Sequence, residues 1–265
     1  MKNILFLGCG KMGSILANNL LAQKLDSKIS VIKKSDKNKI TKLKYYKNFD
    51  ELPKNYQADL IFLAIKPQDS KKILTELSKS KIFNKNTIFI SILAGKKISF
   101  FEEIFGLDAK IIRSMPNLPI EHFQGIFSYL ANKNITKLEL KKLQKIFDNF
   151  GTSIELEDEE NFNVVTAVFG SGPAYIFYLQ EILVEILEEL NCPNQTAKDL
   201  VNQLFYGSIL MSLNNNDFSK LKESVTSKAG TTEAALKVLG QNSQLKNIFK
   251  NAINSAITRS KELQG

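Results

Sequence analysis

Short apolar runs alternate with amphipathic segments over the first part of the chain. This alternation is typical of parallel strands joined by helices, because such strands are buried on both faces and the helices on one. The expected strands are Ile4–Leu7, Ile29–Ile32, Leu60–Ala64, Thr87–Ile92, Ile111–Ser114, Gly125–Leu130 and Ser153–Leu156. The expected helices between them are Met12–Gln23, Asp69–Lys79, Phe100–Phe105 and Lys137–Phe150. The pattern predicts an α/β fold, a doubly wound sheet of the Rossmann type.

Beyond Glu157 the strand pattern ends and helical periodicity replaces it. The expected helices are Pro173–Leu190, Asn194–Leu213, Phe218–Val225, Thr232–Leu239 and Leu245–Leu263. We therefore expect two domains, a sheet domain over residues 1–157 and an all-helical domain over residues 158–265.

The first long helix of the second domain is apolar on more than one face. Its apolar positions are Ile176, Leu179, Ile182, Leu183, Ile186, Leu187 and Leu190. A helix that is apolar on most sides must be covered on most sides. A second copy of the chain is the simplest cover, so we expect a homodimer through the C-terminal helices, or a higher oligomer built from it.

The net charge is +9, from 36 Lys and Arg against 27 Asp and Glu. An excess of this sign can attract an anionic macromolecule. Here it consists mostly of lysines scattered along the chain, whereas a nucleic-acid binder gathers arginines and aromatic residues in one stripe. We expect no nucleic-acid partner.

Membrane, secretion and metal signals are weak. Ala174–Leu190 comes closest to the roughly 18 uninterrupted apolar residues of a membrane span, but one glutamine and four glutamates break it. The run Ile4–Leu7 is too short for a signal peptide. Cys9 and Cys192 are far apart, which gives neither a disulfide framework nor the spacing of metal ligands. The expectation is a cytoplasmic protein with no membrane partner and no metal.

A glycine motif follows the first expected strand and begins a helix. Gly8, Cys9, Gly10, Lys11, Met12 and Gly13 read Gly-x-Gly-x-x-Gly. In a dinucleotide fold the first glycine permits a tight turn, the second lets the backbone approach a pyrophosphate, and the third allows close helix–sheet packing. A turn that binds nothing also matches the bare motif, but a strand before it and a helix after it favour dinucleotide binding.

The second strand ends in Lys33, Lys34 and Ser35, where an NAD-binding chain carries an acidic residue. These side chains can donate hydrogen bonds to a 2′-phosphate, which a carboxylate would repel. The sequence favours NADPH, with NADH binding more weakly. The other interpretation is a pair of ordinary surface lysines.

Three later strand ends meet the same edge of the sheet. Ala64-Ile65-Lys66-Pro67 follows the third strand, and we expect it to line the cofactor cleft. Ile92-Leu93-Ala94-Gly95 ends the fourth, where small residues let a nicotinamide ring pass close to the backbone. Met115-Pro116-Asn117 follows the fifth.

Two segments of the helical domain are rich in glycine and hydroxyl residues. Val225–Glu233 precedes a helix, so its hydroxyls and free backbone N–H groups suit a carboxylate; equally, Thr231 or Thr232 caps that helix. Ala167–Tyr175 carries Gly170 and Gly172 and leads into a helix, and a domain-closing turn explains it as well.

Together these segments resemble the pyrroline-5-carboxylate reductase family over nearly the whole chain. The resemblance rests on LGCGKMG, AIKPQ, ILAG, RSMPNLP, AVFGSGPAYIF and above all LKESVTSKAGTTEAAL. The last is close to the family signature Val-Thr-Ser-Pro-Gly-Gly-Thr-Thr. Lys228-Ala229 stands where the family has Pro-Gly, which leaves the loop less rigid, and Phe169 stands where it has Ser, which alters local packing.

The resemblance implies hydride transfer from NADPH to 1-pyrroline-5-carboxylate, giving L-proline. By the same resemblance the cofactor contacts are Cys9, Lys11, Met12, Lys33, Asn48, Ile65, Lys66, Ala94 and Ser224. The substrate contacts are Glu159, Ser227, Gly230, Thr231 and Thr232. Thr232 would hold the ring nitrogen, and Glu159 would favour the iminium form, as the two catalytic residues.

The alternatives are a reductase of another cyclic imine, a hydroxyacid-type dehydrogenase and a non-catalytic dinucleotide sensor. The dehydrogenase normally needs a lysine on the first long helix of its second domain, and Ala174–Leu190 has none. A sensor has no need of the hydroxyl loop before Thr232. His122, the only histidine, lies in an expected peripheral loop, so we do not expect it to donate a proton.

Overall fold

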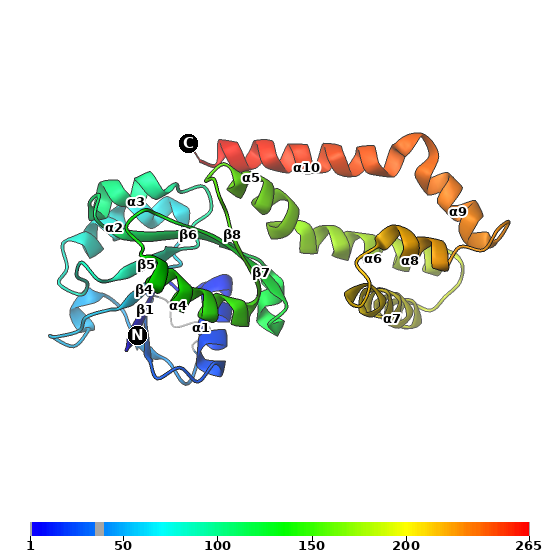
Figure 1. Cartoon of the computed structure of the whole chain (residues 1–265). Helices are drawn as coiled ribbons and strands as arrows, with labels where there is room; N and C mark the ends of the chain where they lie inside the picture. Colours follow the sequence, from blue (N-terminus) through cyan, green and yellow to red (C-terminus); the bar gives the residue numbers. More distant parts are fainter. Residues whose placement is uncertain (1, 35–39, 265) are drawn as a thin grey trace. The chain divides into compact units, whose positions relative to one another are not determined.

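The computed structural model describes residues 2–34 and 40–264 (Figure 1). The chain forms two compact units. The first comprises Met1–Ser171 together with Ala256–Gly265, and the second comprises Gly172–Ser255.

An eight-stranded sheet forms the centre of the first unit, in the order β3-β2-β1-β4-β5-β6-β7-β8. The strands are β1 Asn3–Leu7, β2 Lys28–Ile32, β3 Lys44–Tyr46, β4 Leu60–Leu63, β5 Ile88–Ser91, β6 Lys110–Pro116, β7 Gly125–Ala131 and β8 Gly151–Glu155. All neighbouring strands pair in parallel except β6 and β7, which are antiparallel. The order reverses beside β1, which confirms the predicted doubly wound fold.

Helices cover both faces of this sheet because alternate side chains of each strand point to opposite faces. Ile4 and Phe6 of β1 pack with α1 (Lys11–Ala22) and α4 (Lys137–Phe147). Leu5 and Leu7 pack on the other face with α2 (Ser70–Ser78) and α3 (Ile98–Phe105). All four of these side chains are buried, so close packing on both faces holds β1 and its carboxyl end in position.

The structure adds elements that the sequence pattern missed. The three-residue β3 lies at the edge of the sheet, and the one-turn helix η1 (Phe49–Glu51) follows it. The short helix α5 (Asn161–Val165) continues through the π-helix η5 (Thr166–Gly170), where the pattern predicts a glycine-rich turn. The remaining short helices are η2 Pro67–Asp69, η3 Leu118–His122, η4 Asp148–Phe150 and η6 Gln241–Ser243.

The second unit is helical, as predicted. Its helices are α6 Gly172–Glu189, α7 Asn194–Leu213, α8 Phe218–Ser224, α9 Thr231–Gly240 and the first part of α10 Gln244–Glu262. Of their residues only Ala197 and Val201, both on α7, are buried. The other apolar side chains of these helices are therefore wholly or partly accessible in the single chain.

The division between the units differs from the expected boundary at residues 157 and 158. Phe162 and Val165 of α5 are buried in a small cluster with Leu156, and Met115, Leu130 and Ile154 pack against it. These contacts hold α5 to the sheet, so the first compact unit extends to Ser171.

The end of α10 also belongs to the first unit. The buried Asn163 accepts hydrogen bonds at Oδ1 from Ser260 Oγ at 2.9 Å and Gln264 Nε2 at 2.6 Å. A side chain at Gly95 would collide with the carbonyl of Leu263. Residues 260–264 therefore pack against the first unit beside Gly95 and Asn163, at one corner of the sheet.

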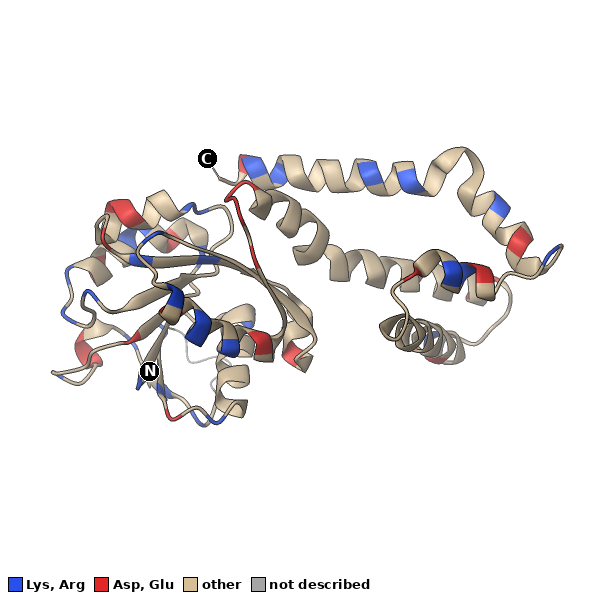
Figure 2. Ribbon diagram, in the orientation of Figure 1, with Lys and Arg blue, Asp and Glu red and all other residues tan. Residues whose placement is uncertain are grey.

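Within the described residues, one helical stretch, Asn161–Glu189, is long and apolar enough to cross a membrane by length and composition, with a mean hydropathy of 1.3. A single helix of this kind is weak evidence, because the core helix of a soluble protein passes the same test. Figure 2 shows Lys and Arg on helices and loops of both units, as expected for a scattered excess.

Candidate functional site

The glycine motif forms the turn between β1 and α1. Gly8 has a left-handed φ of 84°, and a side chain there would lie 2.6 Å from the carbonyl oxygen of Ala64. A Cβ at Gly13 would lie 3.1 Å from that of Ala64, so the helix packs closely on the end of β4. A side chain at Gly10, in contrast, would meet no atom within 4 Å. Gly8 is thus required by conformation and packing, Gly13 leaves little room for a side chain, and Gly10 leaves open space beside the helix start.

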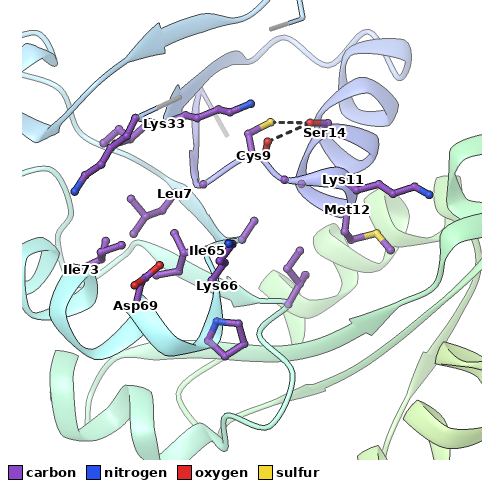
Figure 3. Close-up of a pocket in the computed structure, with 18 of the residues that line it drawn as sticks. Leu7, Cys9, Lys11, Met12, Ser14, Lys33, Ile65, Lys66, Asp69 and Ile73 are labelled. Atoms are coloured by element: carbon purple, nitrogen blue, oxygen red, sulfur yellow. Dashed lines mark hydrogen bonds between the residues drawn. The ribbon is translucent and has the colours of Figure 1, made fainter. Parts of the chain in front are cut away.

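This open space is the rim of a cavity of about 1270 Å³ at the carboxyl ends of β1, β2 and β4 (Figure 3). Helix α1 begins at the cavity with Gly10 as its N-cap, and no side chain caps it. Its first N–H groups are therefore available to a phosphate. A hydrogen bond between the Cys9 thiol and the Ser14 hydroxyl, 3.2 Å apart, ties the glycine turn to α1.

Most residues expected to bind the cofactor line this one cavity. They are Gly8, Cys9, Gly10, Lys11, Met12, Gly13, Lys33, Lys34, Asn48, Ile65, Lys66 and Pro67. Lys33 follows β2 and Lys66 follows β4, and Figure 3 shows both near the glycine turn that carries Cys9. These residues come from separate strand ends, and the sheet order brings them together.

Three expected cofactor residues are not part of this lining. Ser35 lies outside the described residues. Ala94 is exposed on the loop after β5, next to the buried Gly95. Ser224 lies in the second unit at the end of α8, where its hydroxyl donates to the Leu221 carbonyl at 2.7 Å.

The cavity also has walls that sequence reasoning did not identify. Lys47 follows the unpredicted strand β3, and Asp69, Lys72, Ile73 and Glu76 come from η2 and α2. Lys47 reaches the cavity because it directly follows β3. The sequence pattern did not reveal this three-residue edge strand, so Lys47 was missed with it. Glu121 lines the cavity too, whereas its neighbour His122 is exposed and does not.

The expected substrate loop lies in the second unit, between α8 and α9. Gly230 is the N-cap of α9, and neither Thr231 nor Thr232 caps it, because both lie inside the helix. The Glu233 carboxylate instead accepts a hydrogen bond from the Ala229 N–H at 2.5 Å. In the described part of the chain no hydrogen bond engages the Thr232 hydroxyl, which is half-buried. The geometry therefore gives the capping interpretation no support.

A side chain at Gly230 would collide with the Ser227 hydroxyl, so the loop folds tightly over the start of α9. The helix start carries backbone N–H groups and the positive end of the helix dipole, which favour a carboxylate. Ser227 and the N–H groups of α9 thus converge on one small area.

Glu159 lies in the first unit and is tied into its framework. Its Oε1 accepts hydrogen bonds from the Ile98 N–H at 2.8 Å and from Arg113 Nη1 at 2.9 Å. Arg113 is buried, and its guanidinium lies 4.2 Å from the centre of the Phe162 ring. The charge of Glu159 is therefore balanced by a buried cation, a finding that favours a positioning role over stabilisation of an iminium.

The helical part of the chain, residues 159–263, matches the family model described as pyrroline-5-carboxylate reductase dimerisation. Residues 3–95 match the model described as NADP oxidoreductase coenzyme F420-dependent. A curated relative, the pyrroline-5-carboxylate reductase of Pseudomonas aeruginosa, is 31% identical over 98% of this chain and 96% of its own length. The chain belongs to the pyrroline-5-carboxylate reductase family.

Solved members of the family have the same fold. The pyrroline carboxylate reductase of Plasmodium falciparum, solved with NADP bound, superposes with a TM-score of 0.86 at 30% identity, over 100% of this chain and 98% of its own. The pyrroline-5-carboxylate reductase of Coxiella burnetii gives a TM-score of 0.85 at 30% identity, over 100% and 99%. The match extends over both units.

Family membership gives the two departures a structural meaning. Ala229 has a φ of 59°, in the left-handed region that glycine enters without strain, and the family has glycine there. Phe169 is partly exposed on η5, and its carbonyl accepts a hydrogen bond from Asn117 Nδ2 at 3.1 Å. The contact between these two family segments uses the backbone of Phe169, so a larger side chain can replace serine without breaking it.

Proposed function

We propose that this protein reduces 1-pyrroline-5-carboxylate to L-proline with NADPH. The observation that carries the proposal is the 31% identity to a reductase of that name over 98% of this chain. The cavity at the glycine turn supports it. The oxidoreductase model over residues 3–95 and the NADP in the Plasmodium falciparum structure support the choice of cofactor.

The glycine turn suits a dinucleotide. A pyrophosphate would rest on the N–H groups at the start of α1 beside Gly10, where a side chain would otherwise fill the space. Lys33 and Lys34 would hold the 2′-phosphate, together with Asn48. When bound, NADPH supplies the hydride.

The loop before α9 suits the carboxylate of the imine. The N–H groups of Gly230 and Thr231 and the Ser227 hydroxyl would bind it, because they combine hydrogen-bond donors with the positive end of a helix. The Thr232 hydroxyl would accept a hydrogen bond from the protonated ring nitrogen and so orient the C=N bond. Hydride adds to the carbon of the C=N bond and forms the new C–H bond. The π-electron pair of the C=N bond passes to nitrogen, which keeps its proton. Glu159 acts as a positioning residue through Ile98 and Arg113.

We assign residues 1–157 to dinucleotide binding and residues 158–265 to substrate binding and dimerisation, and the dimerisation model over 159–263 supports this division. The active form would be a homodimer, or an assembly of dimers, through the helical unit. A cytoplasmic location agrees with two free cysteines and with a metabolic substrate.

The decisive assay is oxidation of NADPH by the purified protein. Turnover with 1-pyrroline-5-carboxylate should exceed turnover with pyrroline-2-carboxylate and the rate without substrate, and chromatography should identify proline. Preference for another cyclic imine would contradict the proposed substrate but would still agree with the proposed hydride transfer to a C=N bond. Binding of NADPH without turnover of any imine would favour a dinucleotide sensor.

A further inference from the structure

The adenosine end of the cavity carries a cation from a second strand. In a Rossmann sheet the end of β2 recognises the ribose, and here β3 lies beyond β2, away from the glycine turn. Ile32 pairs with Tyr46 in parallel register, and the Lys33 N–H donates to the Tyr46 carbonyl at 2.9 Å. Lys33 and Lys47 therefore occupy the next positions of two adjacent strands, whose spacing is about 5 Å.

The turn after β3 is fixed by its own hydrogen bonds. Asn48 Oδ1 accepts from the N–H groups of Asp50 at 3.0 Å and Glu51 at 3.1 Å. The Glu51 carboxylate in turn accepts from the backbone N–H of Lys47 at 2.7 Å. Because the carbonyl oxygen of Asn48 is engaged in this cap, its NH₂ group remains to donate. The turn thus presents an amide donor and an ammonium group on a rigid backbone.

Charge at this end favours a dianion. Lys47 lines the cavity together with Lys33 and Lys34, and among the described residues no carboxylate pairs with its ammonium group. Lys72 lines the same cavity, but it stands on α2 and not at the strand end next to Lys33. Lys47 is the better candidate for a phosphate contact.

We propose that Lys47 is a specificity-determining residue that contacts the 2′-phosphate of NADPH opposite Lys33. The proposal rests on the proposed cofactor and adds a residue on a different strand. The ammonium groups of Lys33 and Lys47, on adjacent strand ends, would both donate hydrogen bonds to the phosphate. NADH has a hydroxyl at that place, so Lys47 should affect the affinity of one nucleotide and not of the other.

The test compares Lys47→Gln with the unmodified protein for binding of NADPH and NADH, measured by calorimetry without imine. The dissociation constant for NADPH should rise about fivefold, since an exposed charge-assisted contact is weaker than a buried one, while that for NADH stays within about twofold. Lys47→Arg should retain the preference. Lys44→Gln, at the opposite end of β3 and outside the cavity lining, is the matched control and should change neither constant.

Equal weakening of both nucleotides, or none, would overturn the role of Lys47. The salt dependence of NADPH binding should also be less steep in Lys47→Gln, because one cation fewer meets the phosphate. Since binding is measured without imine, an inactive protein that prefers NADPH would overturn only the proposed reaction. An unmodified protein that binds neither nucleotide would overturn both proposals.

Discussion

In the first unit the side chains of Ile4, Leu5 and Phe6 are all 0% exposed, whereas α6, α8 and α9 of the second unit hold no buried residue. Both units have abundant apolar residues, so composition does not explain the difference. A sheet with helices on two faces closes over its own core, while a few long helices leave faces uncovered. The helical unit therefore leaves apolar faces accessible in the single chain, in a region that matches a family model for dimerisation.

The largest effect should follow from charging the uncovered helices. Ile186→Glu with Leu204→Glu places charges on exposed apolar positions of α6 and α7. If a second copy covers them, burial of unpaired carboxylates in both copies should weaken the dimer by more than about 100-fold. Sedimentation velocity measures this directly. The paired control Leu107→Glu with Leu138→Glu charges exposed positions of the first unit and should leave the dimer intact. A stable dimer in the helical variant would contradict the proposed interface.

In the first unit, removal of the Glu159 carboxylate should be costly. Glu159→Ala leaves the buried Arg113 without its partner, and we expect the free energy of unfolding to fall by about 3 kcal/mol. Glu159→Gln keeps an acceptor oxygen and should recover part of this loss. Urea denaturation and steady-state kinetics should be measured on both variants. A stable Glu159→Ala protein with a greatly reduced kcat would instead assign the residue to the chemistry.

Thr232 should behave in the opposite way, with an effect on catalysis and little on stability. It makes no capping hydrogen bond, so Thr232→Ala should change the free energy of unfolding by less than about 0.5 kcal/mol. Loss of its contact to the ring nitrogen should reduce kcat/KM tenfold or more, about 1.4 kcal/mol. Thr232→Ser should restore most activity, and NADPH affinity should be unchanged. Near-normal kcat/KM in Thr232→Ala would leave the backbone N–H groups as the main substrate contacts.

The loop of the second unit also offers a stabilising change. Ala229 has a φ of 59°, so Ala229→Gly should relieve left-handed strain and raise the free energy of unfolding by about 1 kcal/mol. The same substitution at Ala234, inside α9, should lower it by about 1 kcal/mol. Thermal denaturation of both variants measures the contrast, and equal signs would show that the loop is not strained.

The smallest effect concerns one ion pair of the first unit. Burial raises the pKa of Glu139, but hydrogen bonds from Lys110 and Thr136 outweigh it and lower the pKa below its usual 4.5. The pair should therefore contribute about 0.5 kcal/mol above pH 4.5, and this contribution should vanish as the pH falls through the lowered pKa. Denaturation of Glu139→Gln and the unmodified protein should differ at pH 7 and converge in acid. A difference that persists in acid would point to lost packing.

The sequence predicted what local patterns encode. The glycine turn, the helix after it and the strand ends at Lys33 and Ile65 follow from motifs a few residues long. The edge strand β3 was missed because three residues carry too little periodicity, and Lys47 was missed with it. The partner of Glu159 lies 46 residues away on β6, a distance at which no spacing rule operates. Contacts of that kind depend on the register of the whole sheet.

The hydrogen bonds from the end of α10 to Asn163 have a consequence for synthesis. Ser260 and Gln264 follow Asn163 by 97 and 101 residues. A ribosome must therefore translate all of the intervening helices before the corner beside Gly95 can close. Until then the nascent sheet keeps an open corner, which exposes it to chaperones and to premature pairing with other chains. Ser260 and Gln264 leave the exit tunnel after the helices of the second unit, and they complete a unit whose strands were made before those helices.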